Sequence, residues 1–151
     1  TQGAAALLLM SRKKADQLGL EYHYKFSHAV LAGCDPTVMG IGPVPAVQKL
    51  MQKSGLSVAD IGAVELNEAF ASQALACIRE LKLDNENAPF KKVNVWGGAL
   101  ALGHPLGQSG ARIIVTLLNV LKTDFPNEKY GMASLCGAFG NAAAILVEKV
   151  K

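Results

Sequence analysis

The chain has 151 residues, of which 50% are hydrophobic and 18% are charged. This length suits one domain with a buried core, and the composition excludes a disordered chain. The formal net charge of +3 is small and its lysines are scattered, which argues against a nucleic-acid-binding surface.

Other classes are excluded by shorter patterns. The longest apolar runs, residues 4–10 and 142–147, are too short to cross a bilayer, so we expect no membrane contact. No basic segment with an apolar stretch and a cleavage site opens the sequence, so a cytoplasmic location is the default, with mitochondria or peroxisomes also open. Three widely spaced cysteines form neither a disulfide framework nor a zinc site.

Strands and helices are predicted from hydrophobic period and from Gly and Pro positions. Ser11 is a plausible N-cap and Gly19 a plausible helix end. The predicted elements, in chain order, are a strand over 4–10, a helix over 12–18, a strand over 22–32, a loop over 34–45, a helix over 46–53, a strand over 61–66, a helix over 68–81, an extended piece over 93–96, a glycine-rich loop over 97–110, a helix over about 109–122, and strands over 130–136 and 142–149.

This order predicts an α/β layered fold with a five-stranded mixed sheet and helices on both faces. The tight turn over 137–140 makes the last two strands antiparallel. No linker or repeat interrupts the pattern, so residues 1–151 are interpreted as one domain.

The first candidate site residue is Asn67, in the run N-E-A-F-A over 67–71. It lies between a predicted strand and a predicted helix, where asparagine serves as an N-cap. The alternative is that its amide holds a water molecule or a carbonyl oxygen in a binding site. Glu68, in the first turn, is explained by the helix dipole.

The second candidate is His104, within a segment over 97–112 that has five glycines in sixteen residues. So many glycines indicate close approach of the backbone to another group. Pro105 suits a first helical position and would place His104 at a helix N-terminus. There a neutral imidazole could accept a proton from a thiol or stabilise an oxyanion, or it could be a structural histidine.

The third candidate is Cys136, at the end of a predicted strand before the turn over 137–140. A cysteine there could be a nucleophile or an acid/base thiol, although buried cysteines are more often inert. Cys34 and Cys77 are interpreted as structural, as are His23 and His28.

Together these stretches resemble the thiolase family. The run N-E-A-F-A, the motif Gly103-His104-Pro105 and the late Cys136-x-x-x-Gly140 occur in the family's order. Two leading stretches, 3–10 and 35–45, are also similar to thiolases. The resemblance implies the C-terminal domain of a layered thiolase fold, without the N-terminal half that bears the nucleophile.

The resemblance also implies a reaction. Thiolases join two acyl-CoA molecules by Claisen condensation, or cleave a 3-ketoacyl-CoA with free coenzyme A. By analogy, His104 activates the nucleophilic cysteine and binds a thioester oxygen, and Asn67 positions a water that completes this first oxyanion hole. Cys136 would be the acid/base thiol. No cofactor or metal is implied besides the coenzyme A thioesters, which are substrates.

Substrate contacts are implied in the same way. Met39, Ala69 and Phe70 would help to line the acyl and pantetheine pocket, and the backbone near Ala138 would supply a second oxyanion hole. The family's last motif usually has glycine where this chain has Ala138. If that position required a positive φ, alanine would carry a strain cost.

Three hypotheses follow for the molecule as a whole, of which the least favoured is a purely structural α/β domain whose glycine-rich loop serves packing. The first is a thiolase part that is inactive without its N-terminal half, because none of the three cysteines matches the family's nucleophile. The alternative is a catalytically dead relative that binds acyl-CoA or acts as a scaffold. An unpaired half should expose an apolar face, so self-association is also predicted.

Overall fold

The computed structural model describes residues 1–84 and 91–150. Within those two ranges no helix is both long enough and apolar enough to span a membrane. The elements, in chain order, are α1 (Arg12–Gln17), β1 (Tyr24–Gly33), η1 (Pro36–Ile41), α2 (Pro43–Ser54), η2 (Val58–Asp60), β2 (Ala63–Leu66), α3 (Ala71–Glu80), α4 (Ala99–Leu102), α5 (Leu106–Thr123), β3 (Tyr130–Cys136), η3 (Ala138–Gly140) and β4 (Asn141–Lys149).

Four strands form one mixed sheet in the order β1-β4-β3-β2. The predicted antiparallel pairing of the last two strands is confirmed, and β1 also runs antiparallel to β4. β2 runs parallel to β3, with Leu66 opposite Ser134. The carboxyl ends of β2 and β3 therefore lie at the same edge of the sheet.

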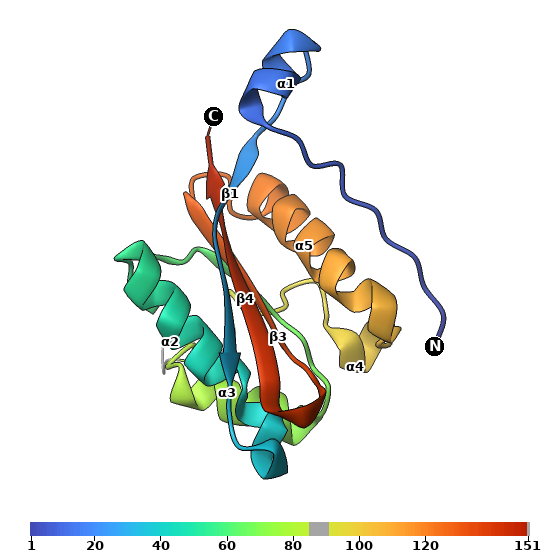
Figure 1. The fold of residues 1–151 in the computed structure, drawn as a ribbon, viewed down its shortest axis with the longest axis vertical. Helices are drawn as coiled ribbons and strands as arrows, with labels where there is room; N and C mark the ends of the chain where they lie inside the picture. Colours follow the sequence, from blue (N-terminus) through green and yellow to red (C-terminus); the bar gives the residue numbers. More distant parts are fainter. Residues whose placement is uncertain (85–90, 151) are drawn as a thin grey trace.

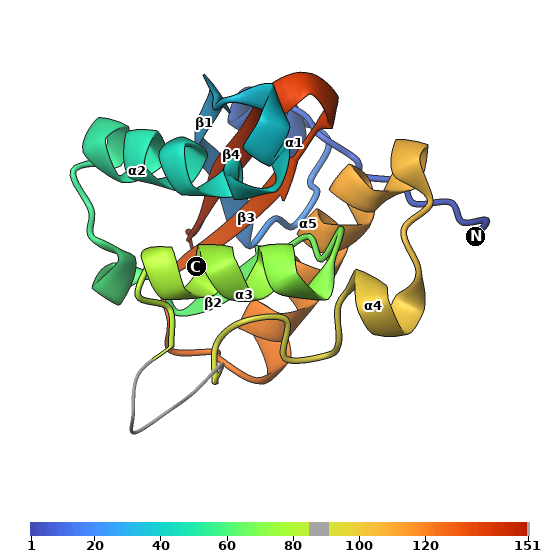
Figure 2. The same cartoon turned by 90° about the horizontal axis from the view of Figure 1, so that it is seen from below.

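Helices cover both faces of the sheet, as predicted (Figure 1). α2 and α3 lie on one face, over a hydrophobic core that includes Leu50, Leu66 and Met132. α5 lies on the opposite face, over a second core that includes Leu117 and Ala133 (Figure 2). The alternation of Met132 and Ala133 between the two cores follows from the period of two along a strand.

The prediction of five strands was wrong, because residues 4–10 form no strand. They run in an extended path along the outer side of α5 (Figure 1), where Leu8 is 84% exposed. An apolar β-type pattern becomes a strand only when another strand supplies hydrogen-bond partners, and none of the described residues pairs with this segment.

Three predicted helix starts were also wrong. α3 begins at Ala71 rather than at residue 68, and α5 begins at Leu106 rather than near 109. α2 begins at Pro43, because proline at the first helical position loses no hydrogen bond there. The predicted glycine-rich loop contains one short helix, α4.

A buried ion pair joins the sheet to α5. Glu65 of β2 is 1% exposed, and its Oε2 lies 3.4 Å from Nη1 of Arg112. Burial raises the pKa of Glu65 to about 7, against the lowering effect of Arg112, while nearby Glu68 raises it further. The other guanidinium nitrogen, Nη2, is buried without a hydrogen-bond partner among the described residues. The ion pair with Glu65 therefore offsets only part of the free-energy cost of burying the Arg112 charge.

Glu65 makes the stability of the fold depend on pH. Its pKa is about 7 in the fold and 4.5 ordinarily, so between these values the folded chain holds a proton that the unfolded chain has released. The stabilisation is fully present below the lower value and is lost as pH rises through the upper one. We therefore expect the free energy of unfolding in urea to decline across this window, and Glu65→Gln to flatten the decline. Parallel profiles for the two proteins would contradict this assignment.

Candidate active site

The carboxyl end of β2 holds Asn67 beside His104. Asn67 is fully buried, and its backbone N–H donates to the carbonyl oxygen of Ser134 in β3 at 2.9 Å. Its side-chain Nδ2 lies 3.4 Å from Nε2 of His104. Because α3 begins only at Ala71, Asn67 is not its N-cap. The structure thus brings two of the three candidate residues together.

A serine fixes the other side of the imidazole. Ser109, fully buried in the first turn of α5, places its Oγ 2.6 Å from Nδ1 of His104. The same hydroxyl donates to the carbonyl oxygen of Pro105 at 3.0 Å. Since its proton is used there, Oγ accepts from Nδ1–H, and the neutral ring keeps a lone pair on Nε2.

The Asn67 amide has an unused acceptor. Its Oδ1 is buried and has no hydrogen-bond partner among the described residues. Buried polar atoms are nearly always paired, with water where no protein group is available. The unpaired oxygen beside the His104 ring is therefore a place for a water molecule or a ligand donor.

Cys136 is the last residue of β3 and lies one strand away from Asn67. It is 8% exposed and belongs to neither hydrophobic core. Alternation along β3 places it on the face of Met132, toward α2 and α3. Among the described side chains no hydrogen bond joins its thiol to Asn67 or His104, although β2 and β3 end at the same sheet edge.

The thiol of Cys136 is protonated at neutral pH. Burial raises its pKa above the ordinary value of 9.0, and the nearby Cys34 raises it further, while a backbone hydrogen bond acts in the opposite direction. Cys77 is fully buried, and its pKa is also raised, mainly by burial and to a lesser extent by Cys136 and Cys34. The three thiols therefore lie near one another, which the sequence did not indicate.

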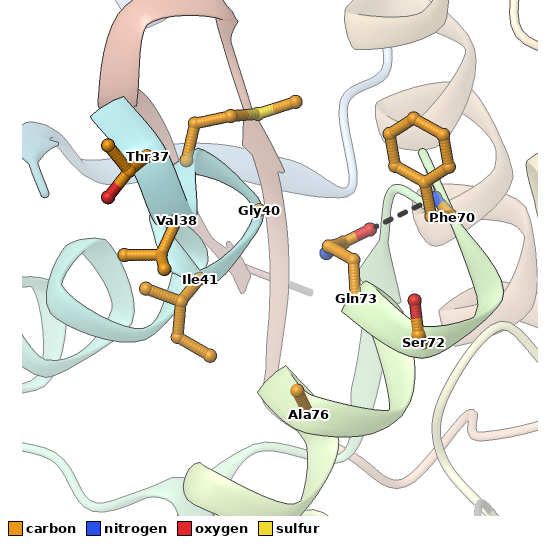
Figure 3. A pocket seen from close by; sticks show the side chains of 9 residues that line it. Thr37, Val38, Gly40, Ile41, Phe70, Ser72, Gln73 and Ala76 are labelled. Carbon is orange, nitrogen blue, oxygen red and sulfur yellow. Dashed lines mark hydrogen bonds between the residues drawn. The ribbon is translucent and has the colours of Figure 1, made fainter. Parts of the chain in front are cut away.

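An apolar pocket of about 560 Å³ opens between η1 and the start of α3 (Figure 3). Met39 and Phe70, predicted to line one pocket, both line this one. Phe70 is 59% exposed. Ala69 does not line it, but its N–H donates to Oε1 of Gln73 at 3.1 Å, and the N–H of Phe70 donates to the same oxygen. Gln73 thus holds the segment that carries Phe70.

The turn after Cys136 does not strain Ala138. Its φ is not positive, whereas Phe139 adopts φ 61° and Gly140 φ 82°. The carbonyl oxygen of Ala138 accepts from Nδ2 of Asn141 at 2.6 Å. Alanine in place of the family's glycine therefore carries no left-handed backbone cost at this position.

The glycine-rich segment approaches other parts of the chain closely, as its composition predicted. A Cβ at Gly98 would overlap the carboxylate of Glu68, and a Cβ at Gly103 would overlap the side chain of Thr1. Gly103 also has φ 93°, which disfavours any other residue. These two glycines serve internal packing, and Glu68 lies outside α3, so the helix dipole does not account for it.

Sequence reasoning missed Ser109, Gln73 and Asn94, which hold the candidate residues in place. Ser109 could have been found from an earlier helix start, because the first turn of α5 then faces His104. Asn94 pairs with the backbone of Leu66 through both ends of its amide, which no local pattern indicates. Within the described parts of the chain, no group of three or more His, Cys, Asp or Glu is arranged to hold a metal ion.

Ser109→Ala tests the fixed tautomer. Removing Oγ leaves Nδ1 of His104 without its acceptor, so the proton is no longer held on Nδ1. We expect the ¹⁵N spectrum of His104 to shift from the Nδ1–H form toward the Nε2–H form. The free energy of unfolding should fall by about 1 kcal/mol for the lost hydrogen bond. Thr116→Ala, which removes a hydroxyl later in α5, is the control and should leave the His104 signals in place.

Comparison with known proteins identifies the family. Residues 20–149 match the family model described as the C-terminal domain of thiolase. The 3-ketoacyl-CoA thiolase of Vibrio parahaemolyticus is 47% identical over 149 residues, and that of Idiomarina loihiensis is 48% identical over 150. These alignments cover 99% of the chain but only 37% and 38% of the two relatives.

Solved structures agree with the sequence match. Human mitochondrial 3-ketoacyl-CoA thiolase superposes with a TM-score of 0.86 at 40% identity, and Acat5 thiolase from Ascaris suum, solved in complex with coenzyme A, with 0.82 at 43%. Each covers 93% of this chain and 34% of the solved chain. The chain therefore belongs to the thiolase family and carries that family's C-terminal domain.

Proposed function

We propose that this chain is the part of a thiolase that supplies an oxyanion-binding pair and an acid/base thiol. The reaction is Claisen condensation of acyl-CoA, or cleavage of a 3-ketoacyl-CoA by coenzyme A. The observation that carries the proposal is the arrangement of Asn67, His104 and Ser109, in which a half-buried imidazole is held between two fully buried side chains.

The tautomer of His104 suits two successive tasks. With its proton on Nδ1, the ring offers a lone pair on Nε2, which accepts the proton of the nucleophilic thiol contributed by the rest of the enzyme. The imidazolium formed in this step then carries a proton on Nε2. That proton, together with a water held by the Asn67 amide, stabilises the negative oxygen of the thioester addition intermediate.

Cys136 is proposed as the group that moves the α-proton. In cleavage, its protonated thiol gives a proton to the carbon that leaves as an enolate, and becomes a thiolate. In condensation, the thiolate removes the α-proton of the acyl-CoA. The α-proton of a thioester is much less acidic than a thiol, so the enolate oxygen needs fixed donors, for which the backbone near Ala138 is proposed.

The pocket between η1 and α3 is proposed to receive the acyl or pantetheine part of the substrate. Its volume of about 560 Å³ and its lining by Met39 and Phe70 suit an apolar chain. Two solved neighbours have coenzyme A bound, as their descriptions state, which supports the choice of a coenzyme A thioester. A cytoplasmic location stays a prediction from the sequence.

The proposal is tested in a chimera. This chain replaces the matching 149 residues of the Vibrio parahaemolyticus enzyme, and acetoacetyl-CoA cleavage is measured. We expect activity in the chimera, none in the 151-residue chain alone, and losses on the order of 10²-fold or more for His104→Ala and Cys136→Ala. Cys77→Ala, a buried thiol outside the proposed chemistry, is the control. Binding of coenzyme A without turnover in a folded chimera would favour the scaffold alternative.

Self-association of the isolated chain is the second expectation. Several large apolar side chains are exposed, and apolar surface tends to be covered where it is contiguous. In sedimentation velocity we expect the average mass to rise with concentration, and Leu100→Glu to reduce the rise. A monomer at every concentration would contradict the prediction. The most exposed of these side chains are Leu8 (84%), Leu31 (73%), Leu106 (81%) and Phe139 (88%), and Leu100 is 61% exposed.

A further inference from the structure

We infer that Glu68 is a positioning residue that sets the separation of Asn67 and His104. The inference rests on the proposed function, since it concerns the geometry of the proposed oxyanion pair. Glu68 follows Asn67 directly in the chain, and neither the resemblance nor the comparisons give it a task. Among the described residues no hydrogen bond joins Glu68 to the imidazole, which is bonded to Asn67 and Ser109, so Glu68 acts through the backbone segments that carry the pair.

The carboxylate of Glu68 joins two segments that are far apart in the sequence. Its Oε1 accepts from Nδ2 of Asn94 at 2.8 Å, and its Oε2 accepts from the backbone N–H of Leu100 at 3.0 Å. Hydrogen bonds to an ionised acceptor are stronger than those between neutral groups. The two oxygens thus hold the end of β2 against the start of α4.

Asn94 anchors the same carboxylate to the sheet. Its Oδ1 accepts from the N–H of Leu66 and its Nδ2 donates to the carbonyl oxygen of Leu66, each at 2.8 Å. The Asn94 side chain therefore pairs with the last residue of β2 as a neighbouring strand would. It holds a left-handed backbone conformation, with φ 47°, to do so. Glu68 is bound on one side to a fixed part of the sheet.

On its other side, Glu68 is bound to a short, stiff path to His104. Leu100 lies in α4, and Gly103 closes that helix through an N–H bond to the carbonyl oxygen of Ala99 at 2.8 Å. His104 is the next residue. A displacement of Leu100 therefore moves the imidazole relative to Asn67, because few free dihedral angles lie between them.

The glycines before α4 are matched to this carboxylate. A Cβ at Gly98 would overlap all three terminal atoms of Glu68, and Gly97 has φ 87°. The absence of a Cβ at Gly98 thus leaves space for the Glu68 carboxylate at the point where the backbone enters α4. An acidic side chain that only capped α4 would not need a glycine at position 98, so the close packing of Glu68 against Gly98 indicates a fixed position for its carboxylate.

The first test reads the His104 environment in the 151-residue chain. Glu68→Gln keeps the shape but turns an NH₂ group toward one of the two donors, so it should displace α4. We expect the ¹⁵N signal of His104 Nε2 to move, while Glu80→Gln, which changes an exposed carboxylate on α3, leaves it in place. Equal spectra for Glu68→Gln and Glu80→Gln would overturn the inference.

The second test is kinetic, in the chimeric thiolase. Misplacing a reacting group by about 1 Å can cost on the order of 10²-fold in rate, so we expect Glu68→Gln to lower kcat by roughly 10- to 100-fold while KM changes little. Glu68→Asp, which keeps the charge, should recover less than full activity because its shorter chain reaches only one donor. A rise in KM with kcat unchanged would assign Glu68 to substrate binding and overturn the positioning role.

A double-substitution cycle separates positioning from loss of folding. Gly98→Ala should lower kcat in the presence of Glu68, because the new Cβ meets its carboxylate. The same substitution should cost much less in a Glu68→Ala background, where that carboxylate is gone. Additive effects would overturn the inference. Full activity of His104→Ala would instead defeat the proposed function, whatever the Glu68 variants do, so the two failures are distinguishable.

Discussion

The parallel pairing of β2 with β3 is the constraint on which the candidate site depends. In an otherwise antiparallel sheet, this one pair brings two carboxyl ends to the same edge, where ligands bind in open α/β sheets. The crossover between the two strands must then leave the sheet and return. It carries α3, α4 and α5, and so it delivers His104 to the edge where Asn67 follows β2.

Buried polar groups at that edge are ordered by one another. The Ser109 hydroxyl links Nδ1 of His104 to the carbonyl oxygen of Pro105, and the Glu68 carboxylate links Asn94 to Leu100. Such networks become rigid when every member is paired, because an unpaired member is costly. Within the described part of this edge, the buried side-chain oxygen left over is Asn67 Oδ1, which is where the proposed water or substrate would complete the network.

The properties of the cysteine thiols are set by burial rather than by a hydrogen-bond network. Cys136, Cys77 and Cys34 lie close together on the side of α3 and η1, and burial keeps Cys136 protonated. A protonated thiol must first donate its proton before it can act as a base. In the proposed cleavage, Cys136 therefore acts first as the acid. The apolar pocket is lined by residues of the same two elements, η1 and α3.

The chain spans little more than a third of the length of its curated relatives. Residues 4–10 have the pattern of a strand but no partner strand among the described residues, and Leu106 and Phe139 are more than 80% exposed beside the site. The chain has one hydrophobic core on each face of its sheet, and large apolar side chains are exposed beside the candidate site.

Local sequence determined the class of the fold, the four strands that find partners and the three motifs, because period and glycine positions act over a few residues. It also placed Asn67, His104 and Cys136 at element ends. Tertiary structure decided that residues 4–10 form no strand, that α3 starts beyond Glu68, and which groups contact His104. Each of these depends on groups distant in the chain. From local sequence, Ser109 and Glu68 were expected only to be helix residues. The packing of α5 and α4 against β2 showed that Ser109 contacts His104 and that Glu68 joins Asn94 to Leu100.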